Sequence, residues 1–160
     1  MLRYGLAVLF AGVALAAHAQ SAAPAVAWEV EVVRDGQTVD TFHATTSVGQ
    51  TRTDTHRIPA SVPVGCGDKA RVFPAERTRA LTVSPVSANG ERIALALDVQ
   101  ETLDDDTAAP QKDPCLPVSP RQIAASHPGL DVTGSHWTDW TLIADHPRLV
   151  YRVRAHLAQD

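Results

Sequence analysis

The chain has 160 residues, of which 44% are hydrophobic and 20% charged, and its formal net charge is −4 at pH 7. Apart from the acidic balance this composition is ordinary, and the chain is long enough to bury a core. The acidic balance argues against nucleic acid or anionic lipid as the main partner.

The first 20 residues have the three parts of a secretory signal peptide. Arg3 supplies the early positive charge, the run from Leu6 to Ala17 is apolar, and Ala17 and Ala19 are small residues before the predicted cleavage after Ala19. The run is shorter than the about 20 residues that a permanent span needs. We therefore expect residues 1–20 to be cleaved and the protein to be periplasmic or secreted, and not an integral membrane protein.

The processed chain has the size of one domain. Loss of Arg3 leaves 13 of the 14 basic residues against 18 acidic ones, a net charge of about −5. We expect a flexible lead-in over 21–26, followed by a single β domain over 27–158.

The stretch from Trp28 to Arg57 predicts a three-stranded meander. Trp28, Val30 and Val32 alternate with glutamates, as in a strand with one buried face. Asp35-Gly36 then suits a two-residue hairpin turn, and Gly49 offers a second turn.

The next part of the chain combines a predicted loop with a predicted hairpin. Two prolines and two glycines between Pro59 and Gly67 predict a loop. Further on, Asn89-Gly90 separates two β-like segments and predicts a hairpin, with Ile93, Leu95, Leu97 and Val99 on one face.

The segment 103–120 is the least regular, with Asp104, Asp105 and Asp106 followed by four prolines around Cys115. We expect a long loop here, and at most a short helical turn near 121–126. Cys66 and Cys115 are the only cysteines, and export to an oxidising compartment predicts that they form a disulfide.

A second hairpin closes the chain, from His136 to Ala144 and from Arg148 to Leu157. Its last strand alternates apolar residues with Arg152, Arg154 and His156. The glutamate-lined face of the first strand is expected to pair with these arginines if the two strands are neighbours. Together these patterns predict an all-β fold, an antiparallel sandwich or partly open barrel of about seven to nine strands.

No motif in the sequence points to a specific chemistry. The histidines show no metal-ligand spacing, although His43 and His56 could meet across the first meander, so no metal and no cofactor are predicted. The three consecutive aspartates lack the spacing of a calcium loop. Because no nucleophile motif occurs, no catalytic residue is predicted.

The aromatic residues near the C-terminus suggest a binding surface. Trp137 and Trp140 are expected on opposite faces of their strand, one in the core and the other covered by a loop or exposed for recognition. Trp137, Trp140, His146 and the aspartates 104, 105 and 106 are the candidate binding residues.

Two functions remain open at this point. The first is a non-enzymatic accessory or binding module of the bacterial envelope, which recognises a protein or envelope component through a sheet edge or the 103–120 loop. The alternative is a small secreted hydrolase or enzyme inhibitor with a loop-borne site near Trp140 and His146.

Overall fold

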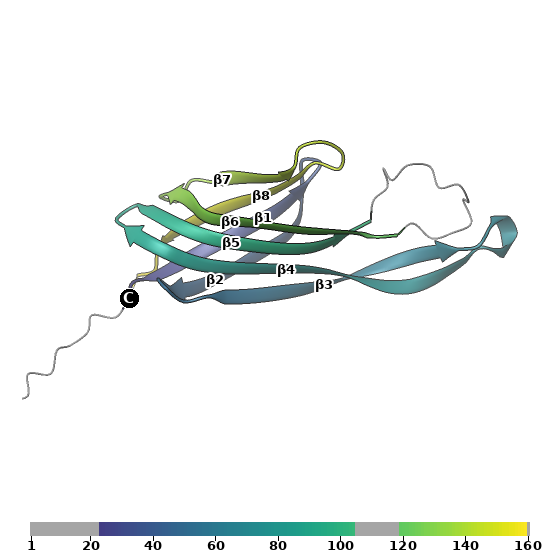
Figure 1. Ribbon diagram of the computed structural model, residues 1–160, viewed down its shortest axis with the longest axis horizontal. Helices are drawn as coiled ribbons and strands as arrows, with labels where there is room; N and C mark the ends of the chain where they lie inside the picture. Colours follow the sequence, from purple (N-terminus) through teal and green to yellow (C-terminus); the bar gives the residue numbers. More distant parts are fainter. Residues whose placement is uncertain (1–22, 105–118, 160) are drawn as a thin grey trace, which may run out of the picture.

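The computed structural model describes residues 23–104 and 119–159, and this part of the chain is almost entirely β structure (Figure 1). One short 3₁₀ turn, η1 (Gly67–Lys69), is the only helical element among the described residues, and none of them forms a helix suited to crossing a membrane. The eight strands are β1 (Ala25–Arg34), β2 (Gln37–Ser47), β3 (Arg52–Val64), β4 (Arg71–Asn89), β5 (Arg92–Leu103), β6 (Arg121–Thr133), β7 (Thr138–Ile143) and β8 (Leu149–Leu157).

The strands form two four-stranded antiparallel sheets that face each other (Figure 1). The first sheet has the order β2-β1-β8-β7 and consists of the N-terminal and C-terminal hairpins, joined through β1 and β8. The second sheet, β3-β4-β5-β6, is a continuous meander formed by the middle of the chain. The sheets do not close into a barrel, so the predicted all-β sandwich is confirmed.

The core lies between the sheets and contains the predicted alternating residues. Trp28, Val30 and Val32 from β1 are at most 3% exposed, and Tyr151 and Val153 from β8 are fully buried. The second sheet contributes a matching set of apolar side chains. These are Leu81, Val83, Ile93, Leu95, Leu97 and Val99.

The prediction of one meander from Trp28 to Arg57 is wrong for its third strand. After β2 the chain turns at Gly49, whose φ is +82°, and β3 enters the second sheet, where it pairs with β4 and not with β2. Alternation cannot distinguish these arrangements, because a strand with one buried face has the same pattern in either sheet. His43 and His56 therefore lie on different sheets.

The predicted loop between Pro59 and Gly67 is instead mostly strand, because β3 extends to Val64. Pro59 and Pro63 are tolerated there since β3 is an edge strand, where a missing N–H does not interrupt a ladder on both sides. The helical turn expected near 121–126 is also wrong. These residues begin β6, in which Arg121 to Ala125 pair with β5.

The turn between β4 and β5 differs from the prediction by one residue. Its two central residues are Gly90 and Glu91, flanked by the paired residues Asn89 and Arg92. Gly90 has φ of +62°, as a turn with glycine at the first central position requires. At the N-terminus, β1 begins at Ala25, two residues before the predicted domain start.

Candidate functional site

Trp137 and Trp140 lie on opposite sides of the first sheet, as their spacing predicts. Trp140 packs toward the core, with its ring centroid 6.1 Å from that of Tyr151 and 5.7 Å from that of His127. Trp137 lies on the outer face beside β8, where the guanidinium carbons of Arg154 and Arg152 are 4.5 and 5.2 Å from its ring centroid. Of the two tryptophans, Trp137 is thus the one on a surface suited to recognition.

The other candidate binding residues do not join Trp137 in one site. His146 lies in the exposed turn between β7 and β8. Asp104 directly follows β5 and binds Arg77, whose Nε donates to its Oδ1 over 2.7 Å. Asp105, Asp106 and Cys115 lie outside the described residues, so the disulfide to Cys66 stays a prediction.

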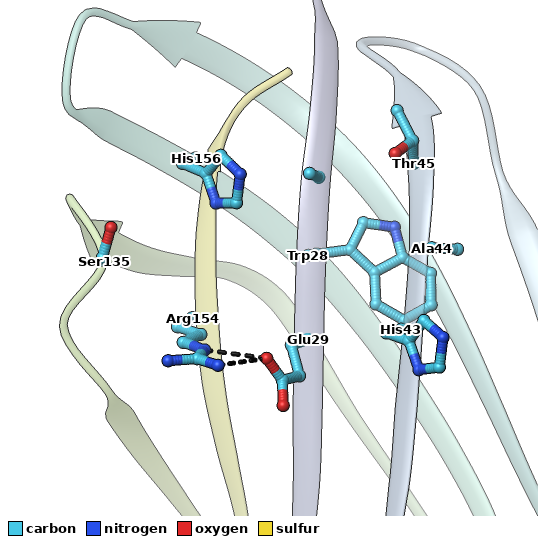
Figure 2. Close-up of a pocket in the computed structure, with 9 residues that line it drawn as sticks. Trp28, Glu29, His43, Ala44, Thr45, Ser135, Arg154 and His156 are labelled. Atoms are coloured by element: carbon cyan, nitrogen blue, oxygen red, sulfur yellow. Dashed lines mark hydrogen bonds and ion pairs between the residues drawn. The ribbon is translucent and has the colours of Figure 1, made fainter. Parts of the chain in front are cut away.

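A hollow of about 600 Å³ lies on the outer face of the first sheet (Figure 2). Its floor is Ala27 of β1, whose neighbours across the ladders are Thr45 of β2 and His156 of β8. Because alanine is small, the outer face is depressed between these two longer side chains. Ser135, in the connection from β6 to β7, borders the hollow on the β8 side (Figure 2).

An ion pair forms one wall of the hollow. Glu29 of β1 lies directly between His43 of β2 and Arg154 of β8, and its Oε2 accepts from Nε of Arg154 over 2.9 Å (Figure 2). Arg154 in turn lies over the indole of Trp137. Two residues further along each strand, on the same face, Nη1 of Arg152 binds Oε2 of Glu31 over 3.3 Å. The predicted pairing of glutamates and arginines across neighbouring strands is therefore confirmed.

A second polar cluster is buried between the sheets, and the sequence did not predict it. Arg79 of β4 and Glu101 of β5 are 4% and 1% exposed and form a hydrogen-bonded ion pair. Arg79 also donates through Nη1 to Oδ2 of Asp40 on β2 over 2.8 Å, and the Tyr151 hydroxyl donates to Oε2 of Glu101 over 2.7 Å. This cluster, Asp40, Arg79, Glu101 and Tyr151, joins both sheets through side chains.

The environment of the cluster changes two acid–base equilibria. Partial burial works against ionisation of Asp40, but hydrogen bonds from Arg79, His56 and the Thr41 N–H outweigh it and hold the pKa of Asp40 below its usual 3.8. Burial, together with the charge of Glu101 and the hydrogen bond to it, raises the pKa of Tyr151 well above its usual 10.0. Tyr151 is therefore a neutral donor at physiological pH.

His56 extends the buried cluster to the surface. Its Nδ1 is 2.9 Å from Oδ1 of Asp40, and its ring stacks on Phe42 with centroids 4.1 Å apart. A histidine oriented by a carboxylate is one part of a catalytic triad. Here the contacts with Asp40 and Phe42 hold His56 against the edge of the core. They link β3, which carries His56, to β2. Within residues 23–104 and 119–159, no group of three or more potential ligands is arranged to hold a metal ion.

The hairpin of β3 and β4 projects beyond the sandwich (Figure 1). β4 pairs with β5 only as far as Arg79. Beyond that point β4 pairs with β3 alone, from the pair Ile58–Arg77 to the pair Val64–Arg71. We call residues 58–77 the arm. Three large apolar side chains are exposed near its tip. They are Val64 (38%), Val72 (67%) and Phe73 (50%).

The sequence does not predict the hollow, the buried cluster or the arm. Each combines residues distant in the chain, and no local pattern marks the pairing that brings them together. The only signal for the hollow was the alternation of Glu29 and Arg154 on outward strand faces. Comparison with known protein families, curated sequences and solved structures gives no match.

Proposed function

We propose that this protein is an exported, non-enzymatic binding module of the bacterial envelope, and that its arm docks on a partner protein. The signal-peptide pattern of residues 1–20 supports export. The observation that carries the proposal is the group of exposed apolar side chains on the arm. Of the six large apolar side chains that are exposed among the described residues, Val64, Val72 and Phe73 lie there.

The physics of the arm supports a docking role. It is a two-stranded ribbon about 20 Å long, and such a ribbon is at best marginally stable without a third strand or a packed face. Exposed apolar groups on it add to the free-energy gain from burial on binding. A projecting ribbon that retains such side chains is therefore favoured when a partner covers it.

The edges of the arm bear on how the partner would dock. Pro59 and Pro63 lie on the free edge of β3, and Pro74 lies on β4 where β5 no longer pairs with it. Proline offers no N–H, so these edges are poor templates for an added strand. We propose docking on the face of the arm that carries Val64 and Phe73. Near the tip Lys69 and Arg71 outnumber Asp68, which favours a partner whose apolar surface has an acidic rim.

A photo-crosslinking amino acid in the arm tests this proposal in periplasmic expression. Placed at Phe73, it should form a discrete crosslinked protein product, which Val64→Ser should weaken severalfold because Val64 lies on the same face of the arm as Phe73 and its apolar contact is lost. The matched control is the same amino acid at Val39 of β2, which is 48% exposed, close to the 50% of Phe73.

Each outcome of the crosslinking decides on the arm. Equal products from positions 73 and 39, or none from position 73 in folded protein, would contradict docking through the arm. Flotation with vesicles of anionic phospholipid, lost on Phe73→Ser, would assign the arm to a lipid surface instead and would also overturn the proposal.

The predicted disulfide belongs to the same proposal. Cys66 directly precedes η1 at the tip of the arm, so a bond to Cys115 would tie the arm to the 103–120 segment. In the chain-entropy model, closing a loop of roughly 50 residues stabilises the fold by about 4 kcal/mol. Mass spectrometry of the exported protein under non-reducing conditions would detect the bond and the cleavage after Ala19.

A further inference from the structure

We infer that the hollow over Ala27 is a binding site for a saccharide, a ligand whose surface consists largely of hydroxyl groups. The hollow lies on the first sheet, whereas the arm belongs to the second, so this inference does not depend on the partner proposed for the arm.

The size and construction of the hollow suit a small ligand. Its volume of about 600 Å³ falls within the range of small-molecule sites, roughly 300 to 1,000 Å³. The lining residues come from β1, β2, β8 and the β6–β7 connection, and Glu29 and Arg154 point toward each other between β1 and β8 (Figure 2). Three of these segments are paired strands of one sheet, which hold their side chains at a fixed register.

The polar groups around the hollow match the chemistry of a sugar. Thr45, Ser135, His43 and His156 line it, and a hydroxyl or a neutral imidazole can both donate and accept a hydrogen bond. A sugar hydroxyl has the same dual character. A ligand limited to one role, such as a phosphate or an ammonium group, would leave half of this capacity unused.

The charges at the hollow favour a neutral ligand. Glu29 and Arg154 are the full charges among the lining residues, and they bind each other, so the wall has no net charge for ionic selection. The same ion pair presents an acceptor and a donor side by side. Neighbouring hydroxyl groups on a sugar ring fit such a pair.

Ala27 supplies a small apolar floor beneath these polar groups. Trp137 does not line the hollow; its indole lies next to Arg154, whose guanidinium carbon is 4.5 Å from the ring centroid, and helps to hold this wall residue in place. An apolar floor beside hydrogen-bonding groups is suited to ligands with one apolar and one polar side, because each side finds its counterpart. The carbon-bound hydrogens of a sugar ring form such an apolar side.

Titration of the purified protein with neutral oligosaccharides tests the inference. The probes are β-1,4-linked oligomers of glucose and of N-acetylglucosamine, followed by calorimetry and by NMR of the histidine ring protons. Ala27→Leu should fill the hollow and weaken binding about tenfold or more, since the floor would no longer admit a ring. Thr41→Leu is the matched control. It places the same side chain on an exposed β2 position outside the hollow and should leave binding unchanged.

Three results would overturn the inference, with thermal unfolding of each variant as the check on folding. These are no binding of either series by folded protein, equal binding by the Ala27→Leu variant, and histidine shifts that inorganic phosphate produces but the sugars do not. Crosslinking through the arm is independent of all three, so the two proposals can fail separately.

Discussion

Arg79 and Glu101 are charged residues in an interior that consists mostly of apolar side chains. A buried ion pair is not by itself stabilising, because desolvation of both charges offsets their attraction. Here the pair is supplemented by Asp40 and Tyr151, which satisfy further hydrogen-bonding groups. Nε of Arg79 is the buried side-chain atom that has no hydrogen-bond partner among the described residues.

The buried pair of Arg79 and Glu101 predicts how single and double substitutions change the free energy of unfolding. Arg79→Met should lower the free energy of unfolding by about 3 to 5 kcal/mol, because Glu101 would be buried without its counter-charge. The double variant Arg79→Met with Glu101→Leu should cost less than Arg79→Met alone, since no unpaired carboxylate remains. Urea unfolding at neutral pH, followed by circular dichroism, measures both. Strictly additive costs would contradict the coupling of these two residues.

At the scale of elements, turns and edges decide where strands begin and end. The β1–β2 hairpin has positive φ at both turn residues, +49° at Asp35 and +83° at Gly36, as its two-residue loop requires. β3 accommodates two prolines because it is an edge strand. The turn residues of the first hairpin could be identified from sequence, whereas the edge position of β3 depends on the partner it pairs with.

The β1–β2 turn predicts that alanine substitutions at Gly36 and Gly129 differ in their effect on stability. Gly36→Ala should destabilise the protein by about 1 kcal/mol, because alanine at positive φ is strained although no atom lies within 4 Å of the new Cβ. Gly129→Ala is the control. An added Cβ there also meets nothing within 4 Å, but φ is not in the positive region, so stability should be unchanged or slightly higher. Equal losses at both positions, in urea unfolding, would rule out the turn as the cause.

At the scale of the whole molecule, the buried cluster connects the two sheets near the base of the arm. Asp40 and Tyr151 belong to the first sheet, and Arg79 and Glu101 to the second. The cluster thus adds directional contacts to an apolar interface. It also couples the stability of the sandwich to pH.

Tyr151 predicts how stability depends on alkaline pH. Its pKa is raised in the folded state, so its contribution is complete below the unfolded value of about 10 and is lost as pH rises above it. The chain has two tyrosines, Tyr4 and Tyr151, so Tyr4→Phe in the full chain isolates the signal of Tyr151. Tyrosinate absorbance should then appear only together with loss of the β circular dichroism signal. Ionisation near pH 10 in a folded chain would contradict burial of this hydroxyl.

Much of the secondary structure was predictable because its signals are local. The alternation in β1, β5 and β8 assigned the buried faces correctly, and the outward charges of Glu29 and Arg154 predicted their pairing. The signals failed where local preference and tertiary context conflict. Residues 121–126 lack a clear strand pattern and form β6 because the edge of β5 is there to pair with.

The sequence by itself determined that this protein is built from antiparallel strands, which side chains of the clearest strands face inward, and where its first hairpin turns. Only the tertiary structure decided how the strands are distributed between two sheets, because period-two alternation records a buried face and not the neighbour that covers it. For the same reason the hollow over Ala27, the cluster around Arg79 and the projecting arm exist only in the fold. Each depends on pairings between strands, or on their absence, and no local pattern encodes these.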